Sequence, residues 1–130
     1  MIGIDNDFIL KNIFEVDNVF NTSKIYNINW QYSSERMELE LIVNNMVKNP
    51  PKKWREWNEI YMRIDFWGIQ DIKIDLNYSG AVIDSWNILE DNGKFVLYAY
   101  LANKKLIQIR YEIAHIQNIK PFNKTDTDEN

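Results

Sequence analysis

Residues 60–76 form the segment that most constrains the fold of this chain. From residue 60 to residue 66, and again from 72 to 76, the even positions are apolar and the odd positions are polar or aromatic. A period of two with the apolar side chains on one side is typical of a half-buried β-strand. Gly68 interrupts the pattern, either as a bulge within one bent strand or at the start of a hairpin loop. In both interpretations the even positions face the same core.

A second strong signal is the Asp-Asn-Gly-Lys sequence at residues 91–94, which lies between two alternating segments. Asn-Gly is the favoured centre of a two-residue type I′ hairpin turn. Such a turn pairs Ile88 with Leu97 on an apolar face. It also pairs Trp86 with Ala99 there, so strand register and burial agree. We therefore predict an antiparallel hairpin around this turn.

Shorter alternating segments predict the other strands, at residues 24–32, 36–43, 105–113 and 112–119. A three-residue loop at 102–104 would set Leu97 against Ile109, whereas a two-residue turn would place Arg110 there, so we expect the longer loop. A short helix or turn is expected near the N-terminus, where residues 5–7 offer capping side chains. The sequence thus predicts a mainly β fold, an antiparallel meander curled into a sandwich or partly open barrel.

The length of 130 residues is that of one domain. We expect a single β domain over residues 1–123 and a disordered tail over residues 124–130, because the tail is polar and has nothing to bury. A long loop is expected over residues 44–58. It contains Pro50 and Pro51, and proline neither continues a helix nor donates a hydrogen bond within a sheet.

Composition argues against several classes of function. The chain has no cysteine, which removes thiol chemistry and cysteine-based zinc sites. The formal net charge is −4 and no basic stripe is present, which argues against nucleic-acid binding. No apolar run approaches the ~18 residues of a membrane span, and the N-terminus lacks the basic region of a signal peptide. We therefore expect a cytoplasmic protein that binds neither membrane nor nucleic acid.

The sequence contains no motif for catalysis, metal binding or cofactor binding. His115 is the single histidine, and no G-x-S-x-G segment accompanies it. The four glycines are isolated, so a phosphate-binding loop is absent. A hydrolase with two carboxylates stays an alternative, and it would need a pair such as Glu38 and Glu40 to be buried together. Asp71 and Asp75 are a second such pair. We expect no enzyme activity, no metal and no cofactor.

The chain is rich in aromatic residues, with five Trp, seven Tyr and six Phe. Most of them are expected to fill the core. Those at core positions of the alternating pattern are Trp30, Phe66, Trp86 and Phe95. Trp54, Trp57 and Trp67 fall in the long loop or at an odd position, where they would cover the end of the core or contact a partner protein. An aromatic-lined barrel interior that holds a small molecule is a further alternative.

Five segments, taken in order, resemble a known protein family. They read FNTSKI at residues 20–25, PPKKW at 50–54, IYMRIDFWGIQDIKI at 60–74, GAVI at 80–83 and IQNIKP at 116–121. Over roughly residues 13–122 the chain resembles the immunity protein 50 family of bacterial polymorphic-toxin systems. Members of that family usually carry a Phe-His-Asp-Ala-Glu-like motif where this chain has Phe20 followed by Asn-Thr-Ser-Lys. No role of those His, Asp and Glu residues therefore transfers.

The resemblance implies a non-enzymatic inhibitor that binds one cognate toxin and blocks its active site or an essential surface. Such a binder needs a rigid scaffold, exposed aromatic anchors and complementary charge. We expect its contacts at the odd positions of residues 60–76 or in the tryptophan-rich loop. The candidate partner-binding residues are Trp54, Trp57, Tyr61, Arg63, Asp65, Trp67, Asp71, Lys73 and Asp75. The alternative function is that of a small-molecule-binding β-barrel module without catalytic activity.

Overall fold

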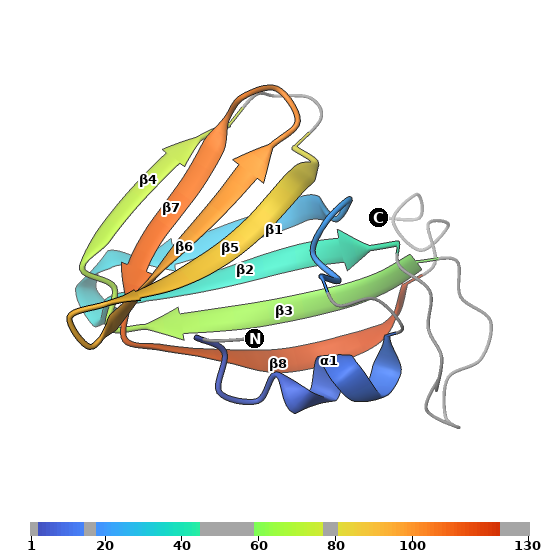
Figure 1. The fold of residues 1–130 in the computed structure, drawn as a ribbon, viewed down its shortest axis with the longest axis horizontal. Helices are drawn as coiled ribbons and strands as arrows, with labels where there is room; N and C mark the ends of the chain where they lie inside the picture. Colours follow the sequence, from blue (N-terminus) through green and yellow to red (C-terminus); the bar gives the residue numbers. More distant parts are fainter. Residues whose placement is uncertain (1–2, 15–17, 45–58, 77–80, 123–130) are drawn as a thin grey trace.

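The computed structural model describes residues 3–14, 18–44, 59–76 and 81–122. Its strands form two four-stranded antiparallel sheets, packed face to face as a sandwich that is not closed (Figure 1). The first sheet has the order β1 (Lys24–Gln31), β2 (Arg36–Val43), β3 (Glu59–Trp67) and β8 (Ile113–Phe122). The second has the order β4 (Asp71–Asp75), β7 (Leu106–Tyr111), β6 (Lys94–Leu101) and β5 (Ile83–Asp91). The predicted mainly β sandwich is confirmed.

β3 and β4 are the two halves of one bent strand, which passes from the first sheet to the second at Gly68. The partner strand bends at the same place, because β8 pairs with β3 and β7 pairs with β4. Glu112 N donates to Trp67 O at 3.0 Å, so hydrogen bonding continues around the corner. Residues 67–71 contain one residue more than the facing residues 110–113. The corner is therefore a β-bulge in a bent strand, and the hairpin-loop interpretation is wrong.

The even positions of this bent strand face the core side on both sides of the corner. Those of β3 are all buried. In β4, Ile72 packs against the core, whereas Ile74 is 39% exposed. β4 is the edge strand of the second sheet, so fewer neighbours cover its end. The predicted direction of these side chains is confirmed, but the core does not extend to the end of β4.

The Asp-Asn-Gly-Lys turn connects β5 and β6 in the predicted register. Asn92 and Gly93 have φ angles of 53° and 78°, and a type I′ turn requires positive values at both central positions. Ile88 faces Leu97 across the hairpin, and both are buried. The connection from β6 to β7 sets Leu97 against Ile109, which confirms the three-residue loop as well.

The N-terminal helix α1 (Phe8–Ile13) lies along the edge formed by β8 (Figure 1). Asp7 is its N-cap but makes no capping hydrogen bond through its side chain. Asn6 instead binds the backbone of Ile116: its Oδ1 accepts from Ile116 N at 2.8 Å and its Nδ2 donates to Ile116 O at 2.9 Å. The side-chain amide thus pairs with the strand edge as a neighbouring strand would, and covers part of it.

The core fills the space between the two sheets. Its fully buried members include Met37, Leu39, Leu41, Met62, Ile64, Leu97, Ile107 and Ile109. Phe20 stacks on Trp86 with ring centroids 4.1 Å apart and so closes one end. A bridge between Lys24 and Val82 joins the start of β1 to the start of the β5 segment, which ties the two sheets together at a second corner.

Several details differ from the prediction. The strands do not form one continuous meander, because β4 and β8 each lie beside a strand far from them in sequence. β1 ends at Gln31 and is followed by the short 3-10 helix η1 (Tyr32–Ser34). β8 continues through Pro121, which a strand at the edge of a sheet tolerates. The predicted tail and residues 45–58 of the predicted loop lie outside the described residues.

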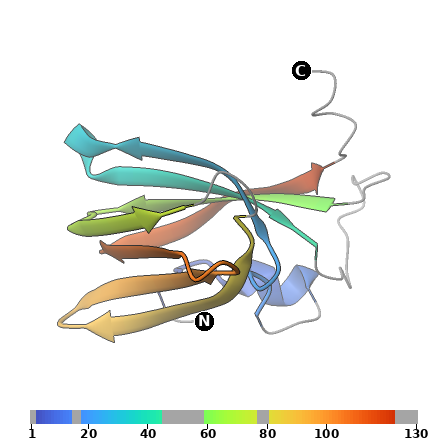
Figure 2. The same ribbon diagram turned by 90° about the horizontal axis from the view of Figure 1, so that it is seen from above.

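Trp30 is the clearest exception to the expected core. Phe66 and Trp86 are buried as predicted and Phe95 is partly buried, but Trp30 is 44% exposed. It faces inward, beside the buried Met37 of β2. Seen from above, β1 projects beyond β4, so the second sheet does not cover this end of it (Figure 2). Across the described parts of the chain, no helix has the length and apolar character needed to cross a membrane.

Replacing Gly68 with alanine tests the corner. Gly68 has a φ of 65°, and an added Cβ would lie 2.7 Å from Cγ of Glu112. We expect Gly68→Ala to lower the free energy of unfolding in urea by about 2 kcal/mol, through left-handed backbone strain together with crowding. Gly93→Ala is the matched control, because its φ is 78° and no atom lies within 4 Å of its added Cβ. Gly93→Ala should lower the free energy of unfolding by only about 1 kcal/mol. Equal losses in the two variants would contradict crowding of residue 68 by Glu112.

Candidate functional site

Asp65 is the centre of a charged network on the outer face of the first sheet. Its side chain is fully buried although it stands at an odd position of β3. Arg36 Nη2 donates to its Oδ2 at 2.7 Å. Arg63 binds both oxygens, with Nε 2.9 Å from Oδ1 and Nη2 3.0 Å from Oδ2. Two guanidinium groups compensate the buried carboxylate, and it fixes their orientation in return.

The same face continues with a second set of contacts around Tyr61. Its hydroxyl donates to the Glu40 carboxylate, which also accepts from Asn27 Nδ2 at 2.6 Å. Lys120 Nζ lies 4.9 Å from the centroid of the Tyr61 ring. Burial, followed by the hydrogen bond to Glu40 and the negative charge of that carboxylate, raises the pKa of the Tyr61 hydroxyl. We call this face the polar layer, and its members are Arg36, Glu38, Glu40, Tyr61, Arg63 and Asp65.

Trp67 lies at the end of the polar layer, next to the corner at Gly68. The guanidinium carbon of Arg36 is 5.5 Å from the centroid of its ring, a cation–π contact. Trp67 is partly exposed, and the side chain of Arg63 is 31% exposed. The hydrogen bond to Asp65 raises the pKa of the Arg63 guanidinium. Trp67 and Arg63 are therefore the predicted contact residues of β3 that a partner can reach.

The candidate residues of β4 lie on the other sheet. Asp71, Lys73 and Asp75 are exposed, and they stand on the side of β4 that faces away from the first sheet. The bent strand thus divides the predicted residues between two faces rather than presenting them on one. Trp54 and Trp57, the two candidates of the long loop, lie outside the described residues.

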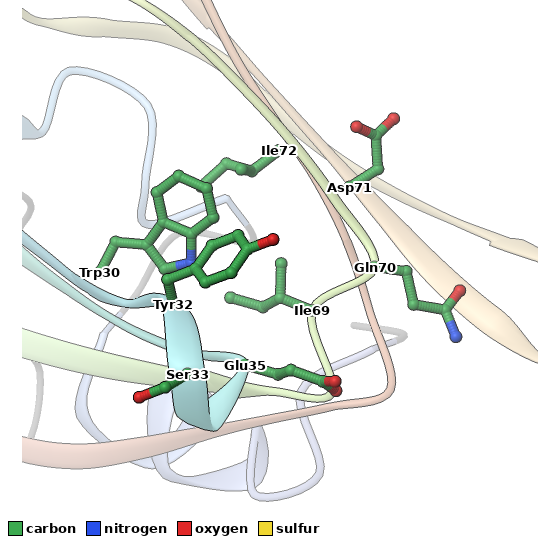
Figure 3. Close-up of a pocket in the computed structure, with 8 residues that line it drawn as sticks. All are labelled: Trp30, Tyr32, Ser33, Glu35, Ile69, Gln70, Asp71 and Ile72. Carbon is green, nitrogen blue, oxygen red and sulfur yellow. The ribbon is translucent and has the colours of Figure 1, made fainter.

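A cleft of about 460 Å³ opens where η1 faces the corner at Gly68 (Figure 3). The rings of Trp30 and Tyr32 meet edge to face, with centroids 5.8 Å apart, and lie beside Ile72 and Ile69 of the corner. We call it the aromatic cleft. The residues that line it are Trp30, Tyr32, Ser33, Glu35, Ile69, Gln70, Asp71 and Ile72.

Sequence reasoning did not find the aromatic cleft, because Trp30 and Tyr32 share the parity of a core strand. A bulge between Ile25 and Asn27 moves Tyr26 to the outer face, and η1 takes Tyr32 out of the strand altogether. The one available signal was their position: Trp30 and Tyr32 come just before a Ser-Ser-Glu turn, at the end of a hairpin, where a facing sheet covers least.

The described residues contain no group of three or more His, Asp or Glu side chains placed to hold a metal ion. Asp65 is the one buried carboxylate among them, and its partners are arginines. His115 Nδ1 lies 2.8 Å from Asp5 Oδ1, and its Nε2 lies 3.2 Å from Asn6 Nδ2. This histidine therefore ties the N-terminal segment to β8.

The fold and its surfaces define a small β-sandwich that presents oriented charged and aromatic side chains. The family model described as Immunity protein 50 matches residues 6–122. The chain therefore belongs to the immunity protein 50 family, which confirms the resemblance seen in the sequence. Membership implies an immunity protein against a polymorphic toxin, with a cognate toxin as partner, in a family that is typically non-catalytic. No curated protein and no solved structure matches the chain.

Removing the buried carboxylate tests what the polar layer contributes to stability. We expect Asp65→Ala to lower the free energy of unfolding by about 2–3 kcal/mol, because it leaves two guanidinium groups side by side. The loss stays below that of a fully buried pair, since both arginine side chains are about 30% exposed and regain water. Asp71→Ala, at an exposed position, should change it by less than about 0.5 kcal/mol. Equal urea midpoints for the two variants would contradict this assignment.

Alkaline pH should destabilise the fold through Tyr61. The pKa of its hydroxyl is raised in the folded state above the usual 10.0. The contribution of this hydroxyl to the stability of the fold is therefore complete below pH 10 and declines as the pH rises above 10. The free energy of unfolding should fall by up to about 1.4 kcal/mol per pH unit from this group. Tyr61→Phe should remove that part of the slope, and Tyr100→Phe, at an exposed position, should leave it intact. An unchanged slope in Tyr61→Phe would contradict the prediction.

Proposed function

We propose that this protein binds one cognate toxin tightly and neutralises it by covering its active site or another essential surface. The match of the immunity protein 50 family to residues 6–122 carries the proposal. We propose further that it acts in the cytoplasm of the protected cell, needs no cofactor and contacts neither nucleic acid nor membrane.

The architecture supports tight binding because its side chains are ordered before the partner arrives. Association costs free energy for every side chain that has to be immobilised at the interface. In the polar layer, Arg63 is already held by both oxygens of Asp65, and the Arg36 guanidinium already lies over the Trp67 ring. Binding through these groups therefore costs less side-chain entropy than binding through mobile arginines would.

Arg63 and Trp67 are the contact residues that the polar layer supports best. Both residue types are enriched among the side chains that contribute most to protein–protein binding, and both are partly exposed here. Asp65 is a positioning residue, because its buried carboxylate reaches no partner and acts through the two arginines. Asp71, Lys73 and Asp75 would meet a partner only where it extends around the corner to the second sheet.

Co-expression with the toxin domain of the polymorphic toxin sought in the gene adjacent to that of this protein tests the proposal. We expect wild-type protein to restore growth of cells that express the toxin domain. We also expect the purified pair to form a complex with a Kd of about 1 nM or below, measured by calorimetry. A toxin domain of a different polymorphic-toxin system serves as the control and should not be neutralised. Absence of both rescue and binding with the adjacent toxin domain would overturn the proposed function.

Arg63→Ala and Trp67→Ala, made together, test the polar layer in the same assay. We expect the pair to weaken toxin binding by roughly 100-fold, as for two central contacts of an interface. Lys11→Ala, at an exposed position of α1 outside the candidate contact residues, is the control and should bind like the wild type. Wild-type affinity in the double variant would remove the polar layer from the interface and leave the immunity function itself intact.

A further inference from the structure

The aromatic cleft lies at an open side of the sandwich. The edge of β8 is partly covered by Asn6, and the start of β5 is bridged to β1 through Lys24 and Val82. β1 and β4 are the remaining edge strands, and neither has a described strand on its outer side along the cleft. Figure 2 shows β1 projecting past β4, which leaves this end of the inner surface without a covering sheet.

Two aromatic rings are displayed at this opening. Trp30 is 44% exposed and Tyr32 is 81% exposed, and the two rings meet edge to face. Exposed aromatic side chains with few rotatable bonds are typical anchors of protein-binding surfaces. Ile69 and Ile72 provide an apolar wall that packs against the aliphatic part of an inserted side chain.

The charge of the cleft defines what that side chain is. Glu35 and Asp71 are among its lining residues, and within the described part of the chain neither carboxylate has a hydrogen bond or an ion pair. Asp71 stands opposite Arg110 of β7, whose Nε donates to Gln70 Oε1 at 3.3 Å, so Glu35 is the carboxylate that gives the cleft its charge. Figure 3 shows Asp71 at the rim, turned outward from the rings, with Glu35 at the other end. No lysine or arginine lines the cleft. The faces of the aromatic rings and the Glu35 carboxylate therefore favour a cation.

The backbone of Glu35 is fixed in position at the end of the turn formed by η1. Its φ of 53° and ψ of 40° lie in the left-handed region, which favours glycine or asparagine over glutamate. Its carbonyl accepts a hydrogen bond from Ile69 N at 3.1 Å, so the turn is tied to the corner. The turn therefore holds the start of the Glu35 side chain beside the corner, at the edge of the cleft.

We infer that the aromatic cleft receives a lysine or arginine side chain of the cognate toxin. The stem of that side chain packs against Trp30 and the apolar wall, and its charged end meets the Glu35 carboxylate. This inference rests on the proposed function and names the chemistry of one contact within it. It also extends the interface, because the cleft and Trp67 lie at the same end of the molecule.

Binding of the adjacent toxin domain, measured by calorimetry at two salt concentrations, tests the inference. We expect Trp30→Ala to weaken binding by roughly 30-fold and Glu35→Gln by roughly 10-fold. The dependence of affinity on salt should become smaller in Glu35→Gln, because one ion pair is lost. The matched controls are Tyr100→Ala and Glu90→Gln, which remove an exposed aromatic ring and an exposed carboxylate on the second sheet and should bind like the wild type.

Glu35→Asn separates binding from folding. Asparagine tolerates the left-handed backbone, so this variant should have a Tm equal to or above that of the wild type and still bind the toxin roughly 10-fold more weakly. A basic residue of the toxin that contacts the cleft should, when changed to glutamate, recover affinity with Glu35→Lys.

The possible outcomes distinguish this inference from the proposed function. Wild-type affinity in both Trp30→Ala and Glu35→Gln would overturn the inference while toxin neutralisation stands. Loss of affinity in Trp30→Ala alone, with an unchanged salt dependence in Glu35→Gln, would show that an apolar group fills the cleft and would overturn the assignment of a cation. Failure of the wild type to bind would overturn both.

Discussion

The bend at Gly68 is the constraint on which the rest of this structure depends. A strand that passes from one sheet into the other needs a partner strand that bends with it. The segment made of β7 and β8 is that partner. The extra residue at the corner allows the turn without breaking the hydrogen-bonded ladder. Both sheets are therefore built outward from one continuous strand pair, and their relative placement follows from its bend rather than from core packing alone.

The polar layer shows how this sandwich tolerates a charge at a buried position. An isolated carboxylate with no exposure would be strongly unfavourable, but the register of β2 and β3 brings Arg36 and Arg63 to Asp65 from both sides. The arginines keep about 30% of their side chains in water, which limits the desolvation cost. The arrangement gives rigid, oriented ion pairs on an outer face, and that rigidity is useful to a binding protein.

Much of the fold was predictable from local sequence. The Asn-Gly turn fixed the register of β5 and β6, and alternation identified the buried side of β3, because both signals act between near neighbours in sequence. The path of the chain at Gly68 was open between two interpretations, since the decision depends on residues 110–113, forty positions away. The pairing of β3 with β8 and of β4 with β7 is likewise set by tertiary contacts that no local pattern contains.

The candidate site was less predictable, for the same physical reason. Alternation places Asp65 correctly on the outer side of β3, but its burial depends on an arginine of β2, so the sequence suggested an accessible charge where the structure has a buried one. Trp30 shows the opposite error, because an inward-facing ring is exposed where the second sheet ends. Position along a strand sets which way a side chain points, whereas the extent of the facing layer sets whether water reaches it.

The two surfaces suited to a partner are linked through the corner. Glu35 and Arg36 are adjacent in sequence, so one carboxylate belongs to the aromatic cleft while the next side chain belongs to the polar layer. Both are fixed against the bend, since Glu35 O accepts from Ile69 N and Arg36 faces Trp67 in the ladder. A partner that meets this end of the sandwich therefore encounters a cation–aromatic pair on one side of β2 and an acidic aromatic cleft on the other.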